Sequence, residues 1–288
     1  MGESNPTGGK LVNKGSYLTV STDDLHNPYF SYPVVSPDRP GEFYRGECLL
    51  INQRDFDPSV GQSPRDGTDI DADRIERVFR SLNYKVTRIL NITKKALDQT
   101  LVEASQKDHS SYDSFVFIML THGGNNIVYT SDDKVQTSYI MSFFRGDRCP
   151  SLIRKPKLFF FQVSRGASYD KGVSTMVADA GDDVIVHKLP VDADILISYS
   201  TVPGYITWCN TTKGSWYIQE LCNALETDIK NGNHTDIMTL LTVVARVVAY
   251  QYRSSTRQVE TDNMKQMTST FSTLTRLFHI TGPPKEIK

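Results

Sequence analysis

The sequence lacks any long hydrophobic run. Its longest apolar stretches, such as Phe115–Leu120 and Leu158–Phe161, have the length of a β-strand, whereas a membrane-spanning helix needs roughly 20 apolar residues. The first 15 residues are polar and glycine-rich, so they also lack the apolar core of a secretory signal peptide. We therefore expect a protein that is neither secreted nor embedded in a membrane.

Cysteine is scarce and charge is balanced. The four cysteines, Cys48, Cys149, Cys209 and Cys222, form no C-x-x-C pair and have no histidine at metal-ligand spacing. The sequence therefore predicts no disulfide framework, no zinc site and no cofactor, which favours a reducing, cytoplasmic compartment. The 32 Lys and Arg residues nearly offset 33 Asp and Glu residues. This balance argues against nucleic acid or an anionic membrane surface as a partner.

What is present indicates a globular chain with disorder at its start. The 288 residues are 39% hydrophobic, which is enough for a substantial core. Residues 1–42 contain many prolines and glycines without sustained periodicity, so we expect a flexible leader there. Folded sequence is expected from about Tyr44 onward.

Short apolar segments alternate with amphipathic ones along the rest of the chain. Strands are predicted at Cys48–Ile51, Tyr84–Ile89, Phe115–Leu120, Leu158–Val163 and Ile195–Ile197, and helices at Thr68–Leu82, from Thr93, at Ser215–Thr227 and at Asp236–Tyr250. A last apolar segment spans Leu274–Ile280. Continuously apolar strands separated by helices predict an α/β fold with a mostly parallel sheet. The glycine- and aspartate-rich stretch Gly166–His187 predicts a mobile linker.

Two predicted strands run directly into polar segments that contain glycine. Phe115–Leu120 is followed by Thr-His-Gly-Gly, and Leu158–Val163 by Ser-Arg-Gly. In an open α/β sheet, ligands bind beyond the carboxyl ends of the strands. We therefore expect His122 and Ser164 to belong to one functional site.

The segment Gln162-Val163-Ser164-Arg165-Gly166, which places Ser164 42 residues after His122, resembles the Q-A-C-[RQG]-G signature of the caspase family. Further segments resemble the family in order, namely Arg65–Asp69, Phe143–Cys149, Lys155–Leu158, Tyr199–Tyr205 and Gly214–Tyr217. The likeness extends from about Gly46 to Phe278 and is closest to executioner caspases with a short prodomain. It implies a six-stranded sheet flanked by helices and a two-fold dimer. It also implies a large-subunit region at 43–179 and a small-subunit region at 180–288, joined through the 166–187 linker into one domain.

The resemblance assigns catalytic positions. Ser164 stands where the family has its nucleophilic cysteine, and His122 matches the general base. The main-chain N–H groups of Gly123 and residue 164 match the oxyanion hole. An alcohol is far less acidic than a thiol, and the sequence identifies no third residue that would orient His122. We therefore expect Ser164 to have very low or no activity.

The resemblance also assigns a substrate groove. Arg65 and Gln162 match residues that grip the substrate aspartate, and Thr207, Trp208 and Trp216 match groove positions. Cys209 stands where the family has a second aspartate-binding arginine. Because a charged hydrogen bond is worth about 1.5–3 kcal/mol, we expect its loss to weaken aspartate binding at least tenfold.

Two interpretations remain open at this stage. The first is a catalytically inactive caspase homologue that acts by binding in the regulation of apoptosis. The second is an active Asp-specific cysteine endopeptidase captured as a Cys-to-Ser mutant at Ser164. Silencing an enzyme needs one substitution, whereas Ser164 and Cys209 are two separate departures, so we favour the inactive homologue.

The resemblance implies partners as well. A homodimer, or a complex with an active caspase, would pair through an edge strand within Met267–Leu277. Such binding would modulate the active partner, and we favour activation over inhibition or sequestration. Asp179 is the expected processing site for an Asp-specific protease. The new N-terminus at Ala180 would be similar to peptides that bind inhibitor-of-apoptosis proteins.

Overall fold

The computed structural model describes residues 25–33, 44–169, 190–256 and 258–282. The chain divides into two compact units, Met1–Phe30 and Ser31–Lys288. In the described part of the first unit, the Phe30 N–H donates to the Asn27 carbonyl at 3.1 Å and closes a turn. The second unit holds the α/β fold. Asp179, and with it most of the predicted linker, lies outside the described residues.

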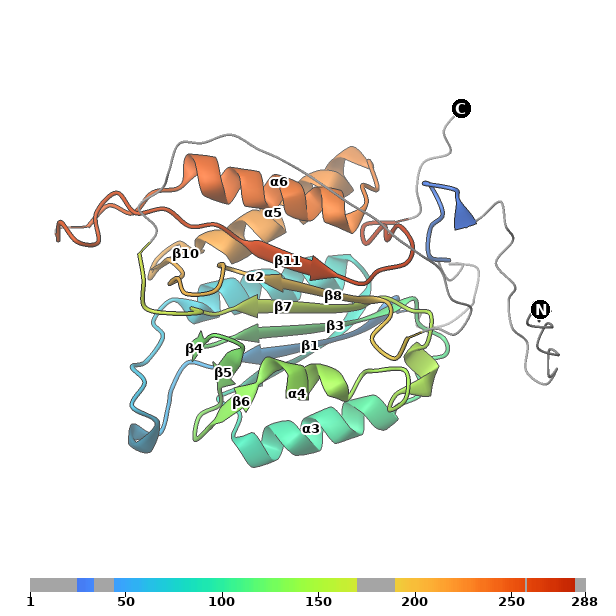
Figure 1. Ribbon diagram of the computed structural model, residues 1–288, viewed down its shortest axis with the longest axis horizontal. Coiled ribbons are helices and arrows are strands. Elements are labelled where there is room, and N and C mark those ends of the chain that lie inside the picture. The colour runs from blue at the N-terminus through green and yellow to red at the C-terminus, as the bar shows by residue number, and fades with distance from the viewer. Residues whose placement is uncertain (1–24, 34–43, 170–189, 257, 283–288) are drawn as a thin grey trace, which may run out of the picture. The chain divides into compact units, whose positions relative to one another are not determined.

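A six-stranded sheet forms the centre of the second unit, in the order β11-β8-β7-β3-β1-β2 (Figure 1). Its strands are β1 (Gly46–Asn52), β2 (Tyr84–Leu90), β3 (Ser114–Leu120), β7 (Lys157–Gln162), β8 (Ile195–Tyr199) and β11 (Ser269–Ser272). Neighbouring strands are parallel except for β11, which pairs with β8 in antiparallel register. The predicted mostly parallel, six-stranded α/β sheet is thereby confirmed.

Helices and small sheets complete the described fold. The helices are α2 (Thr68–Ser81), α3 (Lys94–Gln106), α4 (Thr137–Ser142), α5 (Trp216–Asn231) and α6 (Ile237–Gln251), with 3₁₀ turns η1 (Pro58–Val60) and η2 (Pro150–Leu152). A three-stranded sheet consists of β4 (Gly123–Gly124), β5 (Ile127–Tyr129) and β6 (Lys134–Gln136). A two-stranded sheet consists of β9 (Cys209–Asn210) and β10 (Gly214–Ser215).

Helices cover both faces of the large sheet, with α2, α5 and α6 on one face and α3 and α4 on the other (Figure 1). Successive side chains of a strand point to opposite faces, so a central strand that is covered on both faces is apolar along most of its length. In β3, for example, Val116 and Ile118 belong to the cluster that contains α5 and α6 residues, whereas Phe115 and Phe117 belong to the cluster that contains α3 residues. The unbroken apolar run of β3 is therefore explained by burial on both faces.

The helix boundaries follow local capping chemistry. The Thr93 hydroxyl accepts a hydrogen bond from the Ala96 N–H at 3.2 Å at the start of α3, as the sequence predicts. Helix α5 continues to Asn231, four residues beyond its predicted end at Thr227, because the helix stops only at Gly232. That glycine has a φ of 57° and adopts the left-handed conformation that closes a helix. No helix of the described residues is long and apolar enough to cross a membrane.

Residues Ser31 and Tyr32 differ from the flexible leader expected through residue 42. The Tyr32 N–H donates to the Leu277 carbonyl at 2.9 Å, and its hydroxyl donates to Asp194 Oδ1 at 2.5 Å. Its ring contacts Phe278 at a centroid distance of 6.2 Å. Burial of this aromatic ring offsets the entropy lost when the segment is ordered, so these two residues belong to the folded unit.

Candidate functional site

The candidate site lies where β1, β3 and β7 end together. Asn52 pairs with Leu120, and Leu120 pairs with Gln162, so the carboxyl ends of the three strands are in register. The Gln53 N–H donates to the Leu120 carbonyl at 2.8 Å. The Thr121 N–H donates to the Gln162 carbonyl at 3.1 Å. His122 and Ser164 therefore emerge at the same edge of the sheet, as expected.

His122 is oriented by a main-chain carbonyl. Its Nε2 lies 2.8 Å from the Ser63 carbonyl oxygen, and since a carbonyl only accepts, Nε2 carries the proton and Nδ1 keeps its lone pair. The ring also contacts Phe56 at a centroid distance of 5.1 Å. Burial lowers the pKa of His122, although the bond to Ser63 acts in the opposite direction. The neutral imidazole is therefore available as a base.

The Ser63 carbonyl supplies the orienting group that the sequence did not reveal. It precedes Arg65 in the loop after β1 and lies 59 positions before His122. Because every residue has a main-chain carbonyl, this role leaves no signature in the side-chain pattern. Only the path of the loop could identify it.

Ser164 forms its hydrogen bond with Thr207 and not with this base. Its Oγ accepts a hydrogen bond from the Thr207 N–H at 3.2 Å. Across the described ranges, no hydrogen bond joins Ser164 to His122, and the Ser164 N–H has no acceptor. The Ser164 hydroxyl thus acts as an acceptor, and its main-chain N–H is not used in a hydrogen bond among the described residues.

Gly123 is a position where only glycine fits. A Cβ added there would collide with Val163 Cγ2 and the Ile127 carbonyl oxygen. At Gly124, an added Cβ would meet only the Ile127 side chain, at 3.2 Å for the nearest atom. The close approach of Gly123 to Val163 brings the segment after β3 against the segment after β7 that carries Ser164.

Arg65 provides a positive charge near the site. Its Nη1 donates to the Gln53 carbonyl at 2.9 Å and to Thr68 Oγ1 at 2.7 Å. Burial lowers the pKa of Arg65 to about 10, against the opposing influence of Cys209 and Asp71. The guanidinium therefore keeps its charge at neutral pH, and it contributes to the lowered pKa of His122.

Gln162 is fully buried at the end of β7. Its Nε2 donates to Thr207 Oγ1 at 3.0 Å, whereas its Oε1 has no hydrogen-bond partner in the described part of the protein. Thr207 therefore contacts both Gln162, through its hydroxyl, and Ser164, through its N–H. An unpaired buried oxygen is costly, so Gln162 Oε1 marks a place where a ligand donor would be stabilised.

Cys209 supplies no charge to the candidate site. It lies in β9, opposite Ser215 of β10, and is exposed. Partial withdrawal from water, together with the nearby Asp71, raises the pKa of the Cys209 thiol to about 11, although Arg65 lowers it. The thiol is therefore neutral at physiological pH.

Four aromatic rings, Tyr169, Trp208, Trp216 and Tyr252, pack in a row beside Cys209, and we call this row the aromatic wall. Trp208 and Trp216 stack with ring centroids 5.8 Å apart and an interplanar angle of 22°. Tyr252 lies 5.2 Å from Trp216, and Tyr169 lies 5.9 Å from Trp208. The Trp208 Nε1 proton has no acceptor among the described residues. These rings offer apolar contact surface and one free donor to an extended ligand.

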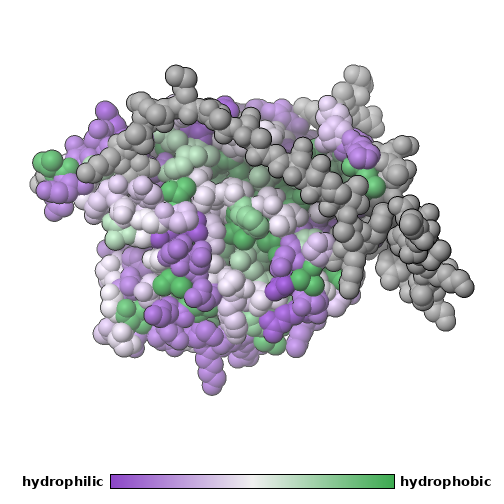
Figure 2. Space-filling view, in the orientation of Figure 1, coloured by the Kyte–Doolittle hydropathy of each residue, from purple (hydrophilic) through white to green (hydrophobic). Residues whose placement is uncertain are grey.

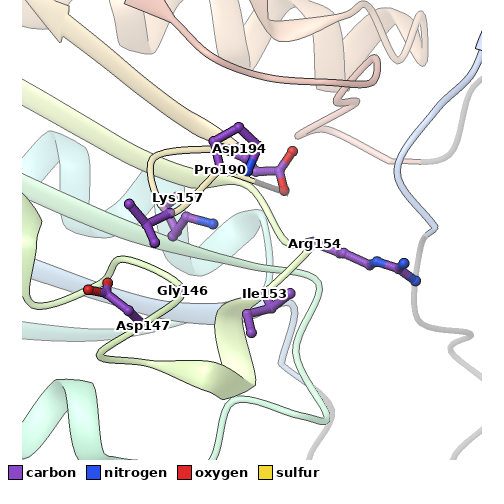
Figure 3. A pocket seen from close by; sticks show the side chains of 9 residues that line it. Gly146, Asp147, Ile153, Arg154, Lys157, Pro190 and Asp194 are labelled. Atoms are coloured by element: carbon purple, nitrogen blue, oxygen red, sulfur yellow. The ribbon is translucent and has the colours of Figure 1, made fainter. Parts of the chain in front are cut away.

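A cavity of about 220 Å³ lies away from this site (Figure 3). Its lining consists of Gly146, Asp147, Ile153, Arg154, Lys157, Pro190, Val191, Ala193 and Asp194. Lys157 is the first residue of β7, whereas Gln162 is the last, so the cavity is at the opposite end of that strand. No group of three or more His, Cys, Asp or Glu side chains suited to a metal ion occurs within the described ranges.

Comparison with known proteins agrees with this geometry. Residues 45–279 match the Caspase domain family. The chain is 39% identical to Caspase-3 of Mesocricetus auratus over 271 residues, which covers 93% of this chain and 90% of that protein. It is 36% identical to Caspase-7 of Gallus gallus over 236 residues, or 80% of this chain and 75% of that protein. The crystal structure of Caspase-1 from Spodoptera frugiperda matches with a TM-score of 0.75 and 34% identity, over 84% of this chain and 96% of that one. The chain therefore belongs to the caspase family and is similar to its executioner members.

Proposed function

We propose that this chain is a catalytically inactive caspase homologue that binds an active caspase and shifts it towards its active arrangement, in the regulation of apoptosis. The observation that carries the proposal is the hydrogen bonding of the Ser164 hydroxyl. Its hydroxyl stands at the nucleophile position of the family and accepts the Thr207 N–H at 3.2 Å, with no hydrogen bond to His122 among the described residues. The proposal places the function in binding rather than in peptide hydrolysis.

The chemistry of a hydroxyl supports inactivity. Cysteine attacks as a thiolate, which a neighbouring imidazole generates readily because the free thiol pKa is about 8.5. A serine needs its proton removed during attack by a hydrogen-bonded, oriented base. His122 is oriented by Ser63, but the hydrogen bond that would carry the proton from Ser164 is missing from the described contacts. Ser164 therefore lacks the activation that an alcohol requires.

Cys209 supports the same proposal independently. An arginine at this position would add a second cation beside Arg65 for the substrate carboxylate. The Cys209 thiol, with its pKa raised to about 11, stays neutral. The alternative, an active Asp-specific endopeptidase silenced at Ser164, is favoured by the intact His122–Ser63 contact and by the tight fit at Gly123. It leaves Cys209 unexplained, because an enzyme needs only one substitution to be silenced.

The edge of the large sheet is the surface we propose for the partner. Strand β11 pairs with β8 on one side, and within the described residues it has no neighbour on the other. Phe271 in β11 is 59% exposed and the nearby Met267 is 40% exposed. Hydrophobic side chains gather around β11 on the face shown in Figure 2. An open edge strand with apolar side chains is suited to pairing with the edge strand of a second caspase chain or a second copy.

Activation of the partner would follow from mass action. A chain that binds the active arrangement of a caspase more tightly than its inactive arrangement shifts the population by that difference in affinity. It needs no nucleophile of its own to do so. We place this activity in the cytoplasm, where the proposed cut after Asp179 would also expose Ala180 to inhibitor-of-apoptosis proteins.

Co-expression with active executioner caspases tests the proposal. The full chain is expected to co-purify with one of them and to raise its peptidase activity in proportion to the complex formed. Phe271→Lys should abolish co-purification, because it puts a charge at the open edge. Tyr250→Lys is the matched control, since Tyr250 is 83% exposed but lies on α6. If no caspase co-purifies and no partner activity changes over a wide concentration range, the proposal fails.

A further inference from the structure

A serine and a histidine form a hydrogen-bonded pair outside the candidate site. Ser31 Oγ lies 3.2 Å from His279 Nε2, and His279 Nδ1 lies 2.5 Å from the His234 carbonyl oxygen. We propose that Ser31 is a nucleophile activated by His279 and that it takes up an acyl group from small activated esters. The inference goes beyond the proposed function, because neither residue belongs to β11 or to the candidate site.

The tautomer of His279 follows from its main-chain partner. A carbonyl oxygen only accepts, so in the neutral imidazole Nδ1 carries the ring proton and donates it to the His234 carbonyl. Nε2 then keeps its lone pair. Because Nε2 can only accept in this tautomer, the Ser31 hydroxyl is the donor in the 3.2 Å contact. The hydroxyl proton is therefore already shared with the nitrogen that would remove it.

This arrangement is the one that activates an alcohol. A serine becomes nucleophilic when an oriented base accepts its proton during attack. Ser31 donates to an imidazole whose other nitrogen is fixed by a carbonyl, whereas Ser164 accepts from the Thr207 N–H. The His234 carbonyl takes the place of the carboxylate that orients the histidine in a Ser-His-Asp triad. Ser31 therefore has the hydrogen bond to a base that Ser164 lacks in the described structure.

Buried neighbours hold both members of the pair in place. Ser31 forms a parallel bridge with Leu277, and the residue after it, Tyr32, is only 5% exposed. The His279 carbonyl accepts a hydrogen bond at 3.1 Å from the buried Arg45 guanidinium. The two side chains are thus kept at hydrogen-bond distance before any ligand arrives. This preorganisation reduces the entropy that must be lost to reach the reactive geometry.

The reaction needs only the pair and an ester. Both side chains are partly exposed, so a small ester can reach Ser31 Oγ. The oxygen attacks the ester carbonyl carbon while His279 Nε2 takes the hydroxyl proton. The tetrahedral intermediate then breaks its bond to the leaving oxygen, and His279 passes the proton to that oxygen. The products are an ester of Ser31 and a free alcohol or phenol, and no oxidant or reductant is consumed.

Acetylation by p-nitrophenyl acetate tests the inference on the purified full chain. Absorbance follows the release of p-nitrophenol, and tandem mass spectrometry after an acid quench locates the acetyl group. Ser105 is the reference residue, because it is also partly exposed but donates to the Val102 carbonyl at 3.0 Å instead of to an imidazole. A positioned general base contributes about 10²–10⁴-fold, so release that depends on Ser31 should exceed release that depends on Ser105 at least about a hundredfold.

Three variants separate activation from a structural hydrogen bond. Ser31→Ala should remove the release that depends on Ser31, and Ser105→Ala should leave the release unchanged. His279→Asn keeps a donor for the His234 carbonyl but has no base, so it should remove the same release while the melting temperature changes little. If Ser31→Ala releases p-nitrophenol as fast as Ser105→Ala, or if His279→Asn reacts as fast as the wild type, the inference is overturned.

Discussion

The hydroxyl of Ser164 and the main-chain N–H of Thr207 are joined by a 3.2 Å hydrogen bond across 43 positions of sequence. The bond connects the end of β7 with the segment that leads into the aromatic wall. The Thr207 hydroxyl also accepts a hydrogen bond from Gln162, so hydrogen bonds connect three residues of the candidate site. Ser164 therefore serves as a hydrogen-bond acceptor in the fold, and its proposed place at the nucleophile position can be tested by replacing it.

The first prediction is that the wild-type chain does not hydrolyse Asp-ending peptides and that two substitutions restore hydrolysis stepwise. Ser164→Cys alone should give weak activity with a high KM, because it returns the thiol without the second cation. Cys209→Arg alone should give none. The double variant should exceed Ser164→Cys by about tenfold or more in kcat/KM, measured with a fluorogenic peptide.

Three results would contradict this prediction. Wild-type turnover within about a hundredfold of a kcat/KM near 10⁴ M⁻¹s⁻¹ would show an active enzyme. Ordinary rates from Ser164→Cys alone would show that Cys209 belongs to a working pocket and that the chain is a silenced protease. A double variant that folds but remains inactive would show that the assigned site geometry is wrong.

The two neighbouring glycines after His122 provide a matched pair for stability. Gly123→Ala should lower the free energy of unfolding by about 2–3 kcal/mol or more, because its Cβ collides with Val163 and with the Ile127 main chain. Gly124→Ala should cost less than about 1 kcal/mol, because its Cβ meets only the movable Ile127 side chain at 3.2 Å. Urea denaturation of both variants measures the difference. Equal losses would mean that the two segments are not closely packed at Gly123.

A buried ion pair ties the start of the fold to its end. Arg45 Nε lies 3.0 Å from Asp113 Oδ2, with side-chain exposures of 8% and 1%, and the Arg45 guanidinium also donates to the main chain at His279 and Ile280. Arg45→Met should destabilise the protein by about 3–5 kcal/mol, because it removes the cation paired with a buried carboxylate and the hydrogen bonds to the main chain at His279 and Ile280. Denaturant titration measures this loss.

The control for that substitution is an exposed pair. Arg80 is 57% exposed and lies 2.7 Å from Glu76 on the surface of α2. Arg80→Met should change the free energy of unfolding by no more than about 0.5 kcal/mol, since solvent screens the pair. A loss of similar size in both variants would show that the Arg45 effect comes from something other than burial of its partner.

Stability is expected to fall as the pH is lowered from about 7 to 5. Burial lowers the pKa of both His109 and His122 in the folded chain, while both titrate near 6.5 when unfolded. Below that pH the unfolded chain binds more protons, so the free energy of unfolding decreases with decreasing pH. His109→Gln should reduce this slope in urea titrations at several pH values. A slope that the substitution leaves unchanged would exclude His109 as a contributor.

Processing by an active caspase is expected after Asp179, which lies outside the described residues. The local sequence Val177-Ala178-Asp179-Ala180 places a small residue after the aspartate and suits an Asp-specific protease. Incubation with an active executioner caspase, followed by mass spectrometry, should show a new N-terminus at Ala180. Asp179→Glu should prevent this cut. A chain that stays intact, or is cut elsewhere, removes Asp179 from the proposal.

Local sequence was sufficient for the elements that local forces determine. The apolar runs inside β3 and β7 predicted strands correctly, because a strand that is covered on both faces is apolar along most of its length. The Thr93 hydroxyl caps α3 by accepting a hydrogen bond from the N–H of Ala96, only three residues later, so this contact is also local. The motif around Ser164 also placed the candidate site at a strand end, because the family resemblance supplied what periodicity does not contain.

Long-range contacts decided the rest. His122 meets the Ser63 carbonyl across 59 positions, and Tyr32 meets Asp194 across 162. Neither contact has a sequence signature. The first uses a main-chain oxygen, which every residue has, and the second joins a tyrosine and an aspartate that belong to no motif. The unpaired Oε1 of Gln162 is likewise visible only once its neighbours are in place. The sequence by itself determined the strands and the helices, and it placed a serine at position 164 and a cysteine at position 209. Only the tertiary structure decided which polar groups are satisfied and which remain free for a ligand, because hydrogen-bond partners depend on distances that chain folding sets.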